Sequence, residues 1–89
     1  MSDAKESLLE FPCQFPIKAM GKNSAEFEAL VVSLVRQHCP DLGEGAVVSR
    51  DSKGGNYLAV TVTVRATSRE QLDNIYRELT ACEHVLMAL

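Results

Sequence analysis

The sequence predicts a two-layer α+β fold, in which a four-stranded antiparallel sheet carries two helices on one face. Residues 58–65 alternate strictly between apolar and more polar side chains, which is the pattern of a half-buried strand. Two other segments repeat apolar residues at helical spacing, and weaker strand-like segments flank them. The element order is therefore β-α-β-β-α-β, and right-handed crossovers then give the strand order 4-1-3-2 of a ferredoxin-like sandwich.

Length and composition indicate one domain. The 89 residues suffice for a single core shared by a sheet and two helices. We expect residues 1–10 to form a flexible tail and lead-in, and residues 11–89 to form the domain. The formal net charge of −3 argues against nucleic acid as the main partner. The acidic N-terminal residues, the lack of a long apolar run and the three cysteines favour a reduced, cytoplasmic protein without a membrane span.

The first strand is expected to begin near Ile17. Pro16 lacks the N–H group that a strand ladder needs, so regular pairing should start after it or bulge there. The inward side chains are expected to be Phe15, Ile17 and Ala19, and the outward ones Lys18 and Met20.

The first helix is predicted from Ser24 to about Cys39. Asn23 and Glu26 stand three residues apart, as a capping pair does at a helix start, and Pro40 ends the helix. Apolar residues repeat at the spacing of a helix that lies on a sheet. This stripe consists of Phe27, Leu30, Val31, Leu34 and Val35.

Two further strands are predicted to form a hairpin. Residues 46–52 suit an edge strand because their facing is mixed, and residues 57–66 form the central strand. Between them, Gly54 and Gly55 supply the positive φ that a tight turn over residues 52–56 demands. The inward residues of the central strand are expected to be Leu58, Val60, Val62 and Val64.

The second helix is predicted to run from a cap at Thr67 and Glu70, in the pattern Thr-x-x-Glu, to about Ala81. A short apolar segment over residues 83–89 is predicted to be the fourth strand. The apolar residues of the helix that recur at helical spacing are Leu72, Ile75, Tyr76 and Leu79.

Motifs that would indicate catalysis or metal binding are missing. The sequence contains no Gly-x-Ser-x-Gly elbow and no closely spaced pair of cysteines, and His38 lies far from His84. We expect His38 to interact with the dipole at the end of the first helix, and the cysteines to be small core residues. We therefore expect no enzymatic activity, no metal and no cofactor. The acidic residues expected on solvated helix faces are Glu26, Glu28, Glu70, Asp73 and Glu78.

The segment Lys53–Tyr57 is similar to the start of an RNA-recognition strand motif, which belongs to a module with the same element order. Sequence-specific binding in that module needs aromatic side chains that stack on bases. The next outward residues are instead Ala59, Thr61 and Thr63. RNA binding in that mode is therefore disfavoured.

Several short segments occur together in this chain. They are Leu-Leu-Glu-Phe-Pro at 8–12, Lys-Ala-Met-Gly at 18–21, Ser-Lys-Gly-Gly-Asn-Tyr at 52–57, the pairs at 70–71 and 75–76 before Leu79, and an end shortly after Val85. Together they resemble the YbeD-like family of small proteins from Gram-negative bacteria. The resemblance implies a ferredoxin-like fold similar to ACT-type regulatory domains, which bind amino acids, and a link to lipoate metabolism through neighbouring genes.

The first expected function is a regulatory module of the ACT type that senses a small metabolite or modulates a partner enzyme. Its candidate site is the turn before the first helix, comprising Gly21, Lys22, Asn23 and Ser24. The helix start favours an anion, Lys22 adds a positive charge and Gly21 allows close approach, so a small carboxylate metabolite is expected there. Alternatively, Gly21 only makes the turn and Asn23 only caps the helix.

The second expected function is a protein-interaction adaptor without a small-molecule ligand. With both helices on one face of the sheet, the other face is either solvated or used in binding. The candidate interaction face comprises Lys18, Thr61, Thr63 and Arg65. We expect a contact with a partner protein, or a weak homodimer, through this face.

Overall fold

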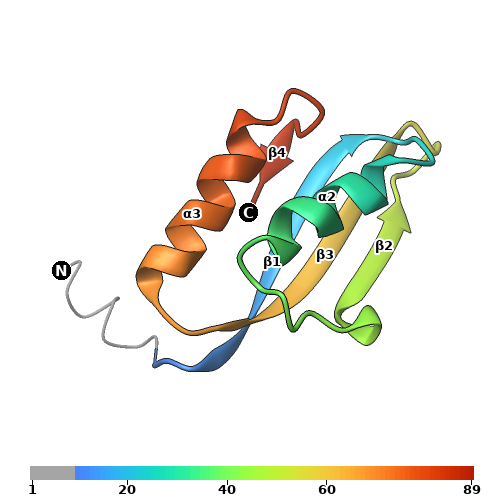
Figure 1. Cartoon of the computed structure of the whole chain (residues 1–89). Coiled ribbons are helices and arrows are strands. Elements are labelled where there is room, and N and C mark those ends of the chain that lie inside the picture. Colours follow the sequence, from blue (N-terminus) through green and yellow to red (C-terminus); the bar gives the residue numbers. More distant parts are fainter. Residues whose placement is uncertain (1–9) are drawn as a thin grey trace, which may run out of the picture.

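The structure is a computed structural model that describes residues 10–89, so all but the last residue of the tail predicted over residues 1–10 lies outside the described residues. The elements follow in the expected order (Figure 1). They are β1 (Cys13–Lys22), α2 (Phe27–Arg36), the 3₁₀ turn η1 (Glu44–Ala46), β2 (Val47–Asp51), β3 (Tyr57–Ala66), α3 (Arg69–Ala81) and β4 (Met87–Ala88).

The strands form one antiparallel sheet in the order β2-β3-β1-β4, which confirms the predicted topology. The central pair runs from Cys13 opposite Ala66 to Lys22 opposite Tyr57. β2 pairs with β3 over residues 47–51, which places the weaker predicted strand at an edge. Figure 1 shows α2 and α3 side by side on the same face of the sheet. The opposite face carries no helix of the described chain.

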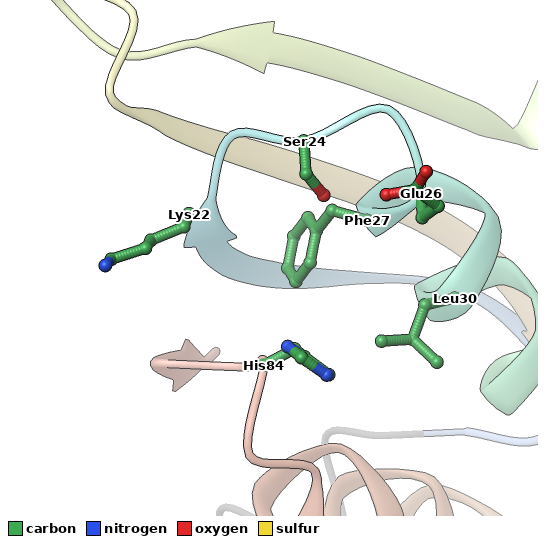
Figure 2. Close-up of a pocket in the computed structure, with 6 residues that line it drawn as sticks. All are labelled: Lys22, Ser24, Glu26, Phe27, Leu30 and His84. Carbon is green, nitrogen blue, oxygen red and sulfur yellow. The ribbon is translucent and has the colours of Figure 1, made fainter.

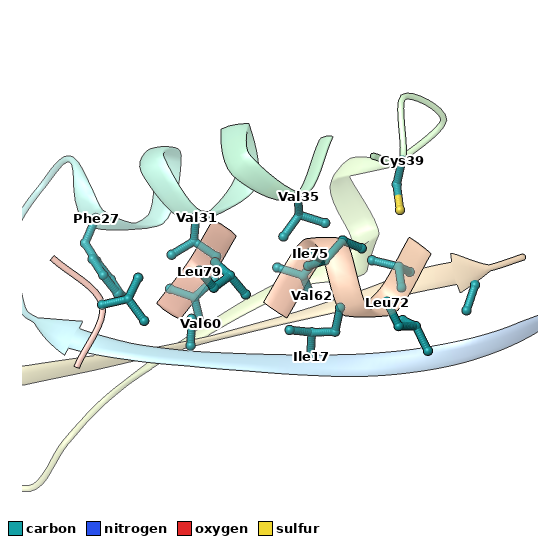
Figure 3. Packing of buried hydrophobic residues seen from close by; sticks show 14 of the residues in the cluster. Ile17, Phe27, Val31, Val35, Cys39, Val60, Val62, Leu72, Ile75 and Leu79 are labelled. Atoms are coloured by element: carbon teal, nitrogen blue, oxygen red, sulfur yellow. The ribbon is translucent and has the colours of Figure 1, made fainter. Parts of the chain in front are cut away.

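The core lies between the sheet and the helices, and its buried side chains are all apolar. The predicted inward residues of β3 are buried, as are Ile17 and Ala19 of β1, whereas Phe15 is only partly buried. Each large apolar side chain buried here contributes roughly 1.5–3 kcal/mol. Figure 3 shows the packing of residues from α2 (Phe27, Val31, Val35) and α3 (Leu72, Ile75, Leu79) over Ile17, Val60 and Val62.

β1 runs through Pro16 without a bulge, so the expected start near Ile17 is wrong. Pro16 lies opposite Thr63 in regular register. Lys18 exchanges backbone hydrogen bonds with Leu89 at 3.0 and 2.8 Å, so the even-numbered residues of β1 direct their N–H groups toward β4. Pro16 is the next even-numbered residue, and β4 does not pair with it. Its missing N–H therefore removes no ladder bond.

The predicted start of the first helix is also wrong, because α2 begins at Phe27 and no side chain caps it. The Asn23 amide instead donates to Asp51 Oδ1 at 3.1 Å and to the Gly55 carbonyl at 3.0 Å. These acceptors belong to the β2–β3 hairpin, which lies beside the turn. Asn23 thus ties the turn to the hairpin, and the helix starts three residues later than expected.

The cap of α3 is displaced by one residue from the predicted Thr67. Ser68 has an extended backbone, and its hydroxyl accepts a hydrogen bond from the Gln71 N–H at 3.1 Å. The Gln71 side chain in turn accepts from the Thr67 N–H at 2.7 Å. Gln71 therefore fills the role predicted for Glu70, and the helix ends at Ala81 as expected.

Two further predictions differ from the structure. The fourth strand is shorter than predicted: β4 spans Met87 and Ala88, and backbone hydrogen bonds to β1 extend it only to Leu86 and Leu89. The chain before it turns away from α3 through a Val85 N–H to Cys82 carbonyl hydrogen bond of 3.1 Å. Glu78 was expected to be solvated, but its carboxylate contacts Nε2 of His38. This contact links α3 to the chain that follows α2, which ends at Arg36 rather than near residue 39.

Candidate functional site

Gly21, the first residue of the predicted ligand site, is in close contact with other parts of the protein. It is buried at the end of β1. A Cβ at this position would clash with the carbonyl oxygen of His84 and would lie 2.5 Å from Cε1 of Phe27. The absence of a side chain thus lets the start of α2 and the segment before β4 meet over β1.

Lys22 and Ser24, two other residues of the predicted site, lie beside a pocket of about 280 Å³. Asn23, between them, is held by the hairpin. The walls come from the end of β1, the turn that follows it, the first turn of α2 and the segment after α3. The lining residues are Lys22, Ser24, Glu26, Phe27, Leu30 and His84 (Figure 2).

The pocket combines an apolar wall with charged groups of both signs. Phe27 and Leu30 provide the apolar surface, and His84 lies across from them in Figure 2. Lys22 extends away from the Phe27 ring, so its ammonium is at the rim. Glu26 supplies a carboxylate at the start of α2, where the first helical N–H groups have no intrahelical partner. A small ligand that carries both an anionic and a cationic group matches this lining.

Sequence reasoning placed Lys22 and Ser24 at the site but missed His84. The position of His84 can be predicted from the sheet topology, because Met20 of β1 pairs with Met87 of β4. An antiparallel neighbour continues past this pair, so residues just before β4 must lie near the end of β1. Leu30 was predicted as a core residue, but it is only partly buried and lines the pocket.

Within residues 10–89, two groups have shifted pKa values, and both lie outside the pocket. Burial raises the pKa of the Cys39 thiol, and the nearby Asp41 carboxylate raises it further. Burial also raises the pKa of the Tyr76 phenol.

Over residues 10–89, no three histidine, cysteine, aspartate or glutamate side chains gather in a way that could hold a metal ion. Within the same range, no helix is long and apolar enough to cross a bilayer.

The predicted interaction face lies on the opposite side of the sheet. Lys18 is paired with Thr61, and these two side chains border a shallow hollow of about 240 Å³ together with Val48, Arg50 and Ala59. Thr63 and Arg65 lie farther along β3 and border a second hollow of about 220 Å³ near η1. The four predicted residues are therefore divided between two hollows.

The fold and the pocket define a small ferredoxin-like α+β domain with a potential ligand site at the turn between its first strand and first helix. The chain belongs to the family described as "Protein of unknown function (DUF493)", whose sequence pattern matches residues 6–89. A UPF0250 protein from Chromobacterium violaceum is 55% identical over 89 residues, covering both chains fully. One from Neisseria gonorrhoeae is 49% identical over 85 residues, covering 96% of this chain and 93% of its own. The family assignment confirms the YbeD-like resemblance.

A solved structure supports the fold. The solution structure of protein HP0495 from H. pylori superimposes with a TM-score of 0.72, covering all of this chain and 93% of its own. The sequences are only 13% identical, so the similarity concerns the fold. The ferredoxin-like prediction is thus confirmed by both the sheet order and this similarity.

Proposed function

We propose that this protein is a small binding module of the ACT type, which takes an amino-acid-like metabolite into the pocket and has no catalytic activity. The pocket lined by Lys22, Glu26 and Phe27 carries this proposal. A cation and an anion flank an apolar wall, which matches the two charges and the side chain of an amino acid. The fold is of the same type as that of ACT domains, which supports the proposal.

Size favours a small metabolite. The volume of the pocket, about 280 Å³, lies just below the roughly 300–1,000 Å³ that accommodate drug-sized ligands. The ligand carboxylate would face Lys22 and the first N–H groups of α2, where the helix dipole favours an anion. Its ammonium group would face the Glu26 carboxylate, and its side chain would contact Phe27 and Leu30.

Ligand binding at this site would alter the structure of distant parts of the domain, because the site is already in contact with them. The turn that lines the pocket is tied by Asn23 to the hairpin, and His84 precedes β4. A ligand that orders the turn would therefore affect both edges of the sheet. This supports a regulatory role, in which the metabolite modulates the contact with a partner enzyme.

The proposal is tested by an NMR titration of the full chain with amino acids, lipoate and common organic acids at millimolar concentration. We expect the backbone amides of residues 20–26 and 84 to shift with at least one amino acid. If these amides stay in place with every compound, the proposal fails.

Two variants separate the ligand classes. Glu26→Gln should weaken the binding of an amino acid but leave a simple carboxylate such as lipoate unaffected, because only the amino acid has an ammonium group to pair. Lys22→Met should weaken both classes. Lys53→Met in the hairpin turn is the matched control, since Lys53 is an exposed lysine that does not line the pocket. Equal binding by the Glu26 variant and the unmodified chain would reject the amino-acid assignment.

A further inference from the structure

We propose that the helix-free face of the sheet is a docking surface for a partner protein that presents acidic and apolar side chains. This inference rests on the β-sheet register and the distribution of charge. It does not depend on a ligand in the pocket at the other side of the domain.

The charged side chains at the outward strand positions of this face have one sign. Strand register directs Lys18 and Arg65 to the helix-free side, because their neighbours Ile17, Ala19 and Val64 are buried on the other side. Arg50 lies on the same side, because it pairs with Ala59 between the buried Leu58 and Val60. No aspartate or glutamate occupies an outward position of β1, β2, β3 or β4. The whole chain nevertheless has 12 acidic and 9 basic residues. Asp41 borders the hollow beside Arg65, at one end of the face, whereas the charged residues that line the hollow between Lys18 and Arg50 are both cations. The part of the face around Lys18 and Arg50 therefore offers a positive potential that attracts and orients an acidic surface.

Apolar side chains lie among these cations. Val48 is 57% exposed, Tyr57 43% and Met87 51%, and each lies on an outward position. The hollow between Lys18, Val48 and Arg50 measures about 240 Å³, which suits the insertion of one side chain. Protein interfaces are enriched in tyrosine, methionine and arginine and depleted in acidic residues at their core. This face likewise carries tyrosine, methionine and arginine and has no acidic residue at its outward strand positions.

Two other occupants fit less well. A second copy docked through the same face would place its own lysines and arginines against these, and like charges across an interface are repulsive. Single-stranded RNA would need several aromatic side chains for base stacking, and Tyr57 is the one aromatic residue at an outward strand position. A protein surface with acidic and apolar side chains matches both the cations and the exposed apolar residues of this face.

The first test places a photo-crosslinking amino acid at Thr61, in the centre of the face, in cells of the native host. The matched control carries it at Asp73, an exposed residue of α3 in the helix layer. We expect protein adducts at residue 61 that do not form at residue 73, with acidic peptides at the crosslinked positions. No adduct at residue 61, adducts with RNA, or adducts with a second copy of this chain would each overturn the proposal.

The second test measures the role of charge. The double variant Lys18→Glu, Arg50→Glu reverses two exposed cations of the face, and Arg36→Glu, Arg77→Glu reverses two cations of the helix layer as a control. We expect the first variant to lose the adducts at residue 61 and the second to keep them. If both variants lost the adducts at residue 61 equally, the overall charge of the protein and not this face would determine binding.

A model peptide makes the same test with purified protein. The probe is a capped peptide of alternating glutamate and leucine of about 12 residues, which at roughly 3.3 Å per residue matches the 39 Å long axis of the domain. We expect amide shifts at residues 18, 50 and 61, weaker binding at high salt, and an affinity about tenfold lower for Lys18→Glu, Arg50→Glu. Unchanged melting temperatures show that the variants are folded. Equal binding of the version with lysine in place of glutamate would contradict the proposal.

Discussion

The two turns that lead from a strand into a helix are built differently, although the two halves of the chain share the same plan. Before α3, Ser68 and Gln71 satisfy the first backbone groups of the helix within four residues of chain. Before α2, no side chain caps the helix, and Asn23 binds the distant hairpin instead. The turn before α3 is thus closed by local side chains, whereas the turn before α2 is held by a distant segment and lies beside the pocket. The binding that we propose falls at the turn that lacks a local side-chain cap.

The largest effect is expected at Gly21, in the turn that carries the pocket. Gly21→Ala places a methyl group against the His84 carbonyl and the Phe27 ring, so we expect a loss of about 2–3 kcal/mol of unfolding free energy. Urea denaturation measures this loss. Gly43→Ala is the control, because a Cβ there meets no atom within 4 Å. Equal stability of the two variants would show that the close packing over Gly21 does not matter.

The serines at the two helix starts provide a second test of the difference between the two turns. Ser68→Ala removes the acceptor for the Gln71 N–H, and we expect it to destabilise the domain by about 1 kcal/mol. Ser24→Ala, at the equivalent turn, should change stability by less than about 0.5 kcal/mol because Ser24 caps nothing. Thermal melting of both variants makes the measurement. If Ser24→Ala costs as much as Ser68→Ala, the two turns are equivalent after all.

Asn23 is expected to have a smaller, long-range effect. Asn23→Ala removes the bonds to Asp51 and Gly55, both exposed, and should cost about 0.5–1 kcal/mol. The loss should appear as faster hydrogen exchange in the β2–β3 turn. Asn74→Ala is the control, since Asn74 accepts only from Arg77 on its own helix. Faster exchange confined to the start of α2 would mean that Asn23 acts as a cap.

The smallest effect is expected in alkaline solution and concerns Cys39, which follows α2, and Tyr76, in the middle of α3. The pKa values of Cys39 and Tyr76 are raised by burial, from ordinary values of 9.0 and 10.0. These groups therefore stabilise the folded state fully below pH 9, and this contribution is lost as pH rises through their folded pKa values. Urea midpoints from neutral pH to about pH 11 measure the decline. The double variant Cys39→Ala, Tyr76→Phe should show a shallower decline, and an identical slope would refute this cause.

The sequence contained enough local information for the sheet but not for the pocket. The alternation from Leu58 to Val64 depends only on neighbouring residues, so the inward face of β3 was predicted correctly. The role of Asn23 depends on acceptors 28 and 32 residues away, which no local pattern reveals. Pro16 was misjudged for the same reason, since its tolerance depends on where β4 ends.

The pairing of β1 with β3 also affects the order in which the domain can assemble during synthesis. It joins segments on either side of α2 and β2, from Cys13 with Ala66 to Lys22 with Tyr57. At roughly 5–20 residues per second, β1 leaves the ribosome seconds before its partner strand exists. The β2–β3 hairpin closes through a local turn within about 10 microseconds. We therefore expect β1 to join a hairpin that has already formed, so that in pulsed hydrogen exchange its amides become protected after those of β2.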